Sequence, residues 1–548
     1  MAGHPDTPAP TPTPTLDPKK ERKTVDVRAS QVEKQPSKES LKPPLGWRLN
    51  VIVIASFIAF FLSLLDTTIV AIALPAISDH FQEFDRSTWI INAYLITYMA
   101  FAILVSRLSD IFGRKIIQLA SLVIFIGFSV GCALSQSITQ LIIFRAFQGM
   151  GGCGMYSMCM VVCMTMLPPQ RRSIMAAYVG VCMVCSGVLG PVLGGAITFN
   201  RERSTWPWIF WINLPVGCLT LGALTVAWPS DRSRTKLTWA ALASVDFFGS
   251  LLLLAASALM VFALQAAGSY QYAWSSATIV ACLVVSGVCF LVFAAWQHLL
   301  TKRPRWSIKV VFPIHLVIKR VIAAATVTTL LLGFTYYLAV VNIPERLQIV
   351  SGSSPIIAGL QMLPFLVFSA IGSVAGGVAS RKDRYTAQTL VVAQAIALLG
   401  YGLLTTLGNA REVPAKLYGF QIFIGLGNGA SIVCLTRLME TAVEPKWIAV
   451  TQGALAQMRT LGGSIGLAIA VIVFNAGVRA SSAINEVLSP AQLNSLFRSP
   501  LAIATFTPPQ QQLVAEAFAH AFTQQMRIAT YIAAAGFIAS LFALPRLA

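Results

Sequence analysis

Asp66 and Arg145 are charged residues in apolar stretches of the sequence, where an isolated charge is unfavourable. Asp66 lies in FFLSLLDTTIVAIALPAI (residues 60–77), and it is the only charged residue between Val51 and Ile77. An ionised aspartate in the middle of a membrane span costs roughly 2.5–3.5 kcal/mol, so it needs a partner, water or a proton. The rise of a helix places Asp66 about 8 Å and Arg145 about 10 Å below the same membrane boundary. We therefore expect either a carboxylate that alternates between Arg145 and a proton, or a permanent ion pair that joins two helices.

The elements that hold these charges are predicted to be membrane-spanning helices. Of the 548 residues, 56% are hydrophobic and 11% are charged, whereas about a quarter of the residues in soluble domains are charged. A run of about 20 apolar residues crosses the hydrocarbon core of a bilayer, and the chain contains fourteen such runs. They begin near Val51, Thr88, Ile116, Ile138, Ala176, Trp208, Ala243, Ser276, Val321, Pro355, Ala387, Leu417, Ala449 and Ile528. The sequence therefore predicts an all-α integral membrane protein.

The basic residues are distributed unevenly between the two sides of the membrane. If the N-terminus is cytosolic, 29 of the 40 Lys and Arg residues lie on the inner side, 9 lie outside and 2 lie within spans. This is the distribution that the positive-inside rule describes. The net charge of +19 then reflects membrane topology, and we predict cytosolic termini and no nucleic-acid partner.

Internal repetition predicts two similar halves. FRAFQGMG begins at Phe144 and FQIFIGLG begins at Phe420, an offset of 276 residues that also relates Gly187 to Gly463. Transporters are often built from duplicated halves, and six helices match on each side if the seventh and eighth are an insertion. We predict four parts: a proline-rich, disordered cytosolic tail (1–48), a six-helix half (49–230), two inserted helices with a cytosolic linker (231–310) and a second six-helix half (311–548).

The residues needed for several other kinds of chemistry do not occur in suitable patterns. The ten cysteines lie within apolar spans, the five histidines are scattered, and neither HExxH nor a GxxxxGK[ST] phosphate loop is present. We therefore predict no metal site, no cofactor and no enzymatic reaction.

Several motifs together resemble the major facilitator superfamily. SRLSDIFGRK (106–115) is similar to the family's signature loop between the second and third helices, although Ser106 stands where the family has glycine. LDTTIVAIALP, FQGMGG, SGVLGPVLGG, WPWIFWINLPVG and RTLGGSIG extend the resemblance over residues 50–475. These motifs look most like the fourteen-helix drug:proton antiporter branch, of the fungal toxin and secondary-metabolite efflux type. The resemblance implies the major facilitator fold, with two six-helix halves and two inserted central helices.

In the signature loop, Asp110, Gly113, Arg114 and Lys115 are the candidates for a conformational latch. A carboxylate that faces two cations where two helices meet the cytosol can hold one conformation closed. A run of solvated surface charges is the alternative interpretation.

The fifth span carries the small residues and proline that the resemblance assigns to an antiporter motif, namely Gly187, Gly190, Pro191, Gly194 and Gly195. Small residues permit close helix contact, and proline permits a kink. In the antiporters this motif marks exchange rather than uptake. Ordinary helix packing would explain the same residues equally well.

Polar aromatic residues and one further arginine suggest a substrate pocket, because an amphipathic compound needs a few polar groups on an apolar wall. The candidates are Asn92, Tyr94, Tyr98, Tyr336, Tyr337 and Arg459. Packing of the tyrosines, and a structural role for Arg459, are the alternatives. Glu345 and Arg346 depart from the family pattern and are either an outer gate pair or an interfacial anchor, and a long outer loop is expected at 477–527.

The resemblance implies a proton-coupled secondary transporter that exports small lipophilic or amphipathic compounds, such as drugs, toxins or secondary metabolites, by alternating access. Its partners would be the small-molecule substrate, protons and the lipid bilayer. We expect a monomer in the plasma membrane, with a vacuolar or vesicle membrane as the alternative. A transporter of iron chelates or basic amino acids, and a transport-inactive membrane sensor, also remain open.

Overall fold

The computed structural model describes residues 46–81, 84–167, 172–198, 205–229, 246–268, 272–302, 319–408, 413–444, 447–498, 503 and 506–544. The predicted tail (1–48) lies outside the described residues, apart from its last three positions. Every element in the described part is helical.

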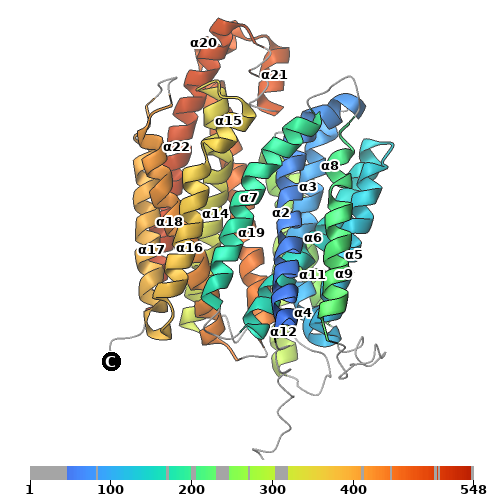
Figure 1. Ribbon diagram of the computed structural model, residues 1–548. Helices are drawn as coiled ribbons and strands as arrows, with labels where there is room; N and C mark the ends of the chain where they lie inside the picture. Colours follow the sequence, from blue (N-terminus) through green and yellow to red (C-terminus); the bar gives the residue numbers. More distant parts are fainter. Residues whose placement is uncertain are drawn as a thin grey trace, which may run out of the picture. The chain divides into compact units, whose positions relative to one another are not determined.

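The helices of the first half are α2 (Trp47–Phe81), α3 (Phe84–Ala100), α4 (Ala102–Phe112), α5 (Arg114–Ala133), α6 (Ile138–Met166), α7 (Arg172–Thr198), α8 (Trp208–Trp211) and α9 (Asn213–Ala227). The two helices in the predicted insertion are α11 (Phe247–Gly268) and α12 (Ala277–Lys302). The second half contains α14 (Arg320–Ile349), α15 (Pro355–Leu360), α16 (Leu363–Ala379), η2 (Asp383–Tyr385), α17 (Thr386–Leu404), α18 (Lys416–Ala442), α19 (Ile448–Ala480), α20 (Ser482–Val487), α21 (Pro490–Arg498) and α22 (Pro508–Leu541). Figure 1 shows the long helices running side by side, with α20 and α21 projecting beyond them at one end.

Among the described residues, ten helices are long and apolar enough to cross a membrane. The number rises to eleven if Trp89–Ala100 and Ala102–Phe112, which meet at a bend of 46°, form one span. This establishes an all-helical membrane protein. The total of fourteen spans stays a prediction.

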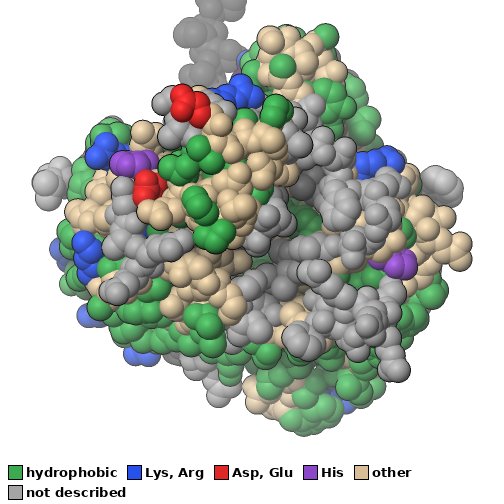
Figure 2. Space-filling model, turned by 90° about the horizontal axis from the view of Figure 1, so that it is seen from above, with side chains coloured by type: hydrophobic (Ala, Val, Ile, Leu, Met, Phe, Trp, Pro, Cys, Tyr) green, Lys and Arg blue, Asp and Glu red, His purple; other side chains and the backbone are tan. Residues whose placement is uncertain are grey.

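The expected outer loop at 477–527 is largely helical. Helix α19 continues to Ala480, α20 and α21 follow, and α22 begins at Pro508, well before the predicted start near Ile528. A capping box between Thr507 and Gln510 starts α22. Because the first turns of α22 are rich in glutamine, they lack the hydrophobicity on which the sequence prediction depended. Figure 2, which views the side from which α20 and α21 project, shows mostly hydrophobic and uncharged side chains.

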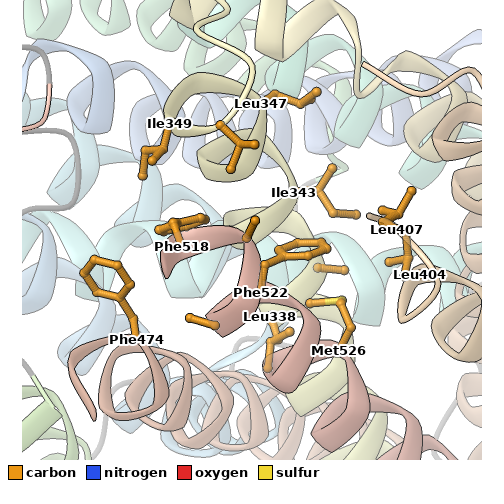
Figure 3. Close-up of a cluster of buried hydrophobic side chains, with 14 of the residues drawn as sticks. Leu338, Ile343, Leu347, Ile349, Leu404, Leu407, Phe474, Phe518, Phe522 and Met526 are labelled. Carbon is orange, nitrogen blue, oxygen red and sulfur yellow. The ribbon is translucent and has the colours of Figure 1, made fainter. Parts of the chain in front are cut away.

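Each half has its own hydrophobic core. In the first half, α2 packs against α6, α7 and α9, and the buried cluster there includes Phe60, Phe125 and Met155. In the second half, α14 packs against α19 and α22. Figure 3 shows Phe518 and Phe522 of α22 within this second cluster. Burial of each such phenylalanine contributes roughly 1.5–3 kcal/mol.

The halves contact each other through α7 with α16 and α4 with α19. The inserted helix α11 contacts both α3 and α19. On one side, Trp89 of α3 stacks on Phe262, with ring centroids 5.2 Å apart. On the other, Gln457 of α19 donates a hydrogen bond to Ser257. Helix α11 therefore connects an element of each half.

Asp246, which precedes α11, joins the two inserted helices. Its carboxylate accepts hydrogen bonds from the Gly249 amide at 2.7 Å, from Trp296 at 2.9 Å and from Gln297 at 2.6 Å. Because Trp296 and Gln297 belong to α12, this buried carboxylate holds the ends of the two helices together.

Candidate functional site

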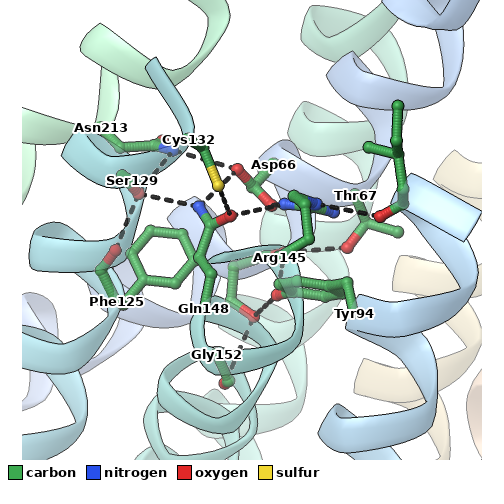
Figure 4. A network of polar contacts seen from close by, with 12 residues as sticks. Asp66, Thr67, Tyr94, Phe125, Ser129, Cys132, Arg145, Gln148, Gly152 and Asn213 are labelled. Carbon is green, nitrogen blue, oxygen red and sulfur yellow. Dashed lines mark hydrogen bonds and ion pairs between the residues drawn. The ribbon is translucent and has the colours of Figure 1, made fainter. Parts of the chain in front are cut away.

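The structure brings Asp66 of α2 and Arg145 of α6 into direct contact in the first half (Figure 4). The exposed fraction is 1% for Asp66 and 0% for Arg145. The Nη1 group of Arg145 donates to Oδ2 of Asp66, and its Nε group donates to the carbonyl oxygen of Ile90 at 3.2 Å. The two residues that the sequence placed at similar depth therefore form a sealed ion pair.

Two amide side chains complete the shell around the carboxylate. Gln148 of α6 and Asn213 of α9 both donate to Oδ1 of Asp66, at 3.0 and 3.1 Å. Gln148 also accepts from Arg145 at 2.7 Å and donates to Ser129 of α5 at 2.7 Å. Four helices therefore contribute to one polar network, which stabilises the ionised form of Asp66.

Sequence reasoning missed Gln148, Asn213 and Ser129. Gln148 follows Arg145 by three residues, a spacing that puts both side chains on one face of α6. That signal was available in the sequence. Asn213 and Ser129 come from distant helices, and no local pattern indicated them.

Tyr94 was predicted to line a substrate pocket, but it belongs to the sealed network. Its exposed fraction is 1%, and its ring lies under the Arg145 guanidinium, 4.3 Å from the ring centroid. Its hydroxyl group is 3.0 Å from Oγ of Ser63. A Cβ atom on Gly152 would overlap that hydroxyl group, so the close approach of α6 to Tyr94 requires glycine at this position.

A second polar site lies between the two halves, around Arg459 of α19. The Nη2 group of Arg459 donates to the hydroxyl group of Tyr156 on α6, and its guanidinium lies 5.5 Å from the centroid of that ring. Tyr98 of α3 lies beside Tyr156, with ring centroids 6.4 Å apart. Tyr337 of α14 interacts electrostatically with Arg459. This arginine and its three tyrosines are only partly buried.

The structure therefore brings together three of the predicted pocket residues and adds Tyr156, which sequence reasoning missed. Tyr336 lies beside Tyr337, with ring centroids 5.6 Å apart, and also packs against Phe365, at 5.8 Å. Asn92 is half-buried on α3, and the described part of the chain gives its side chain no polar contact.

Glu345 and Arg346 do not form the outer gate pair that was one of the two expectations. Arg346 has an exposed fraction of 1%, donates to the carbonyl oxygen of Gly408 at 2.8 Å and lies 5.5 Å from the Phe522 ring centroid. Glu345 is half-buried, and no ion pair joins it to Arg346 in the described structure. Consecutive residues on a helix point about 100° apart, so the two side chains diverge.

At the end of the molecule predicted to be cytosolic, Asp110 of α4 forms an ion pair with Arg107, at 3.6 Å. Lys115, one of the predicted latch cations, donates instead to the carbonyl oxygen of Trp228 at 2.8 Å. Gly113 has a φ of 94° and Arg114 begins α5, so the turn between α4 and α5 requires the backbone freedom of glycine.

Arg107, which sequence reasoning missed, reaches the other half. Its guanidinium lies 5.3 Å from the ring centroid of Trp447, the residue that precedes α19. The spacing of three residues between Arg107 and Asp110 indicates in the sequence that the two side chains share one helix face. No sequence pattern indicates the contact with Trp447.

The glycine-rich motif of α7 lies at helix contacts. Gly190 is buried, and a Cβ atom there would overlap Oγ1 of Thr68 on α2. A Cβ atom on Gly187 would lie 3.0 Å from a methyl group of Leu366 on α16. Pro191, Gly194 and Gly195 continue the same helix. The motif therefore lets α7 approach helices of both halves closely.

Within the described ranges, no group of histidine, cysteine, aspartate and glutamate side chains could hold a metal ion. The candidate sites are thus an ion-pair network inside one half and an arginine among tyrosines between the halves. Both are suited to reversible charge neutralisation rather than to bond-making chemistry.

Comparison with known proteins identifies the chain's relatives. Residues 56–467 match the Major Facilitator Superfamily. The MFS-type transporter FPY5 of Fusarium mangiferae is 35% identical over 505 residues, which cover 90% of this chain and 83% of that protein. The efflux pump dotC of Dothistroma septosporum is 28% identical, with 89% of this chain and 83% of the relative covered.

Among solved structures, a bacterial homologue of the human lysosomal transporter Spinster, in an inward-facing and occupied conformation, is similar in fold. Its TM-score is 0.56 at 15% sequence identity, and the match covers 90% of this chain and 96% of that one. At this identity the similarity concerns the fold alone.

Proposed function

We propose a proton-coupled export function for this chain, which belongs to the major facilitator superfamily and is therefore a multi-pass membrane transporter rather than an enzyme. The cargo that we propose is a small lipophilic or amphipathic compound, such as a drug, toxin or secondary metabolite. Relatives named as efflux pumps from fungi and the glycine-rich motif of α7 support export.

The observation that carries proton coupling is the buried Asp66–Arg145 pair. With Arg145 beside it and amide donors from Gln148 and Asn213 around it, the carboxylate is stable in its ionised form. If Arg145 moves away during transport, Asp66 remains in a low-dielectric environment and the neutral, protonated form becomes favourable. One carboxylate would then alternate between an internal cation and a proton from outside.

In this proposal, alternating access of the two halves moves the cargo, and a rearrangement within the first half, which contains both residues, separates Arg145 from Asp66. The halves have separate cores and meet at α7–α16 and α4–α19, so they can move against each other as units. The latch at the cytosolic end would be formed by Asp110, Arg107 and Trp447. There the ion pair between Arg107 and Asp110 of the first half meets the ring of Trp447 in the second half.

The proton-carrier role of Asp66 can be tested with a double variant that removes both the carboxylate and the arginine charge, so that no unpaired charge is left in the membrane. The cargo would first be identified by comparing metabolites inside and outside cells with and without the protein. Transport of that cargo would then be measured in vesicles that carry an imposed proton gradient. The variant Asp66→Asn combined with Arg145→Gln should insert normally but lose gradient-driven export. Full export by this double variant would contradict the proton-carrier role.

We further propose a monomer in the plasma membrane, with residues 49–230 and 311–548 as the moving halves and 231–310 as the insertion.

Both termini should be cytosolic. Tags at either end should therefore stay inaccessible at the surface of intact cells, and detection of one end alone would mean an odd number of spans.

A further inference from the structure

Arg459 is a membrane-embedded cation that the described part of the protein does not neutralise. It lies about 17 Å along α19, within the span Val450–Arg479. Among the described residues, its one hydrogen bond goes to the uncharged hydroxyl group of Tyr156, and its electrostatic neighbours are the phenols of Tyr156, Tyr337 and Tyr98. No carboxylate of the described residues pairs with it.

The remaining donors of Arg459 have no hydrogen-bond partner among the described residues. A guanidinium group has five N–H donors, and Tyr156 occupies one of them. The side chain is only partly buried, although it lies deep in a membrane helix. Its other N–H groups donate no hydrogen bond to the described residues and are not among the fully buried polar atoms that lack a partner, so they keep some solvent exposure.

The side chains that surround Arg459 come from both halves and are aromatic. Tyr98 and Tyr156 belong to the first half, whereas Tyr337 and Arg459 belong to the second. A Cβ atom on Gly463 would overlap the Tyr337 ring, so α19 and α14 are in close contact there and hold Tyr337 beside the arginine. Flat, polarisable walls of this kind favour a planar ring system in the ligand.

We infer that Arg459, with Tyr98, Tyr156 and Tyr337, binds the acidic group of an aromatic or conjugated cargo, such as a carboxylate, phenolate or enolate. This inference rests on the proposed export function and specifies its substrate class. A guanidinium binds a carboxylate through two parallel hydrogen bonds, and such a cargo would neutralise a cation that otherwise lies unpaired in the membrane. The same reasoning disfavours basic amino acids as cargo.

The test compares three ligands that share one ring: 2-naphthoate, the neutral 2-naphthamide and the cationic 2-naphthylmethylammonium. Binding to the purified, full-length protein is measured by equilibrium dialysis, without a proton gradient. The acid should bind at least about tenfold more tightly than the amide, because one charge-assisted interaction is lost in the amide. The amine should bind more weakly than the amide.

Two variants test whether Arg459 causes the preference for the acid over the amide. Arg459→Gln should weaken binding of the acid about tenfold and leave the amide unchanged. Arg437→Gln is the matched control, because Arg437 is an arginine of the neighbouring helix α18 that pairs with Asp383 at the surface. It should leave all three ligands unaffected. If Arg459→Gln does not fold, the native protein provides the second measurement: acidification that protonates the naphthoate should abolish the acid's advantage over the amide.

Equal affinity for acid and amide, or no detectable binding of the acid, would overturn the inference. An equal loss of both ligands in Arg459→Gln would overturn it as well, since a purely structural arginine has that effect. Because binding is measured without a gradient, an acid preference in a protein that fails gradient-driven export would refute proton coupling alone. Export of a neutral cargo with no acid preference would refute the substrate class alone.

Discussion

Arg145 and Arg459 are both arginines of membrane helices, and their surroundings differ in one decisive respect. Arg145 has an exposed fraction of 0% and contacts the carboxylate of Asp66. Arg459 is partly exposed and contacts phenols. A buried cation needs a negative partner or a ligand. The first arginine therefore has its partner within the protein, and the second is available to an anion that enters.

The two sites also differ in how they relate to the halves. The helices around Asp66, namely α2, α5, α6 and α9, all belong to the first half. The hydrogen bond from Arg459 to Tyr156 crosses from the second half to the first. Movement of one half against the other must break the contact at Arg459, whereas the Asp66 network can change only through rearrangement within one half.

The largest expected difference is in stability. Arg145→Gln leaves the Asp66 carboxylate buried without its cation, which costs about 3–5 kcal/mol. Arg459→Gln leaves no carboxylate of the described residues without its cation, and it should change the free energy of unfolding by about 1 kcal/mol or less. Thermal unfolding of both variants in the same detergent measures the contrast. Equal destabilisation would mean that Arg459 has an anionic partner within the protein.

Two asparagines sharpen the comparison between the halves. Asn213 donates to the Asp66 carboxylate at 3.1 Å, and Asn428 of α18 donates to the uncharged Tyr401 hydroxyl at 2.8 Å. Both are buried, with exposed fractions of 1%. Hydrogen bonds to charged groups contribute about 1.5–3 kcal/mol, and neutral ones contribute about 1 kcal/mol. Asn213→Ala should thus destabilise the protein more than Asn428→Ala, and the reverse order would argue against an ionised Asp66.

The smallest effect on stability is expected at the cytosolic end. Asp110→Asn removes a partly exposed ion pair with Arg107, which is worth about 0–1 kcal/mol. Insertion should be normal, but turnover in vesicles should fall several-fold if the pair helps to hold α4 against α19. Asp383→Asn, which removes the exposed pair with Arg437, is the control. Unchanged turnover in Asp110→Asn would favour the solvated-surface interpretation.

The pairing of Asp66 with Arg145 could be anticipated from sequence because depth in a membrane follows from residue count alone. The other members of the network could not be anticipated in the same way. Asn213 and Ser129 are ordinary polar residues at the ends or within the faces of their helices, and only the packing of α5 against α6, and of α9 against α2 and α5, brings them into the network around Asp66.

Tyr94 and Tyr98 show the same limit. They are four residues apart on α3 and stack with ring centroids 5.8 Å apart, so sequence periodicity treats them alike. The structure seals Tyr94 beneath Arg145 and leaves Tyr98 partly exposed between the halves. Which helix covers each ring, rather than its position on α3, decides whether it belongs to the ion-pair network or to the pocket.

The sequence by itself determined the membrane-helical class and the residues whose charge lies in the membrane, because hydrophobic length and charge placement are local properties of the chain. Tertiary structure alone decided that Asn213 reaches Asp66, that Tyr156 faces Arg459 and that Arg107 reaches Trp447. Each of these contacts joins helices far apart in sequence. A contact of that kind depends on how helices rotate and pack against one another, and that rotation is set by the whole core rather than by any single segment.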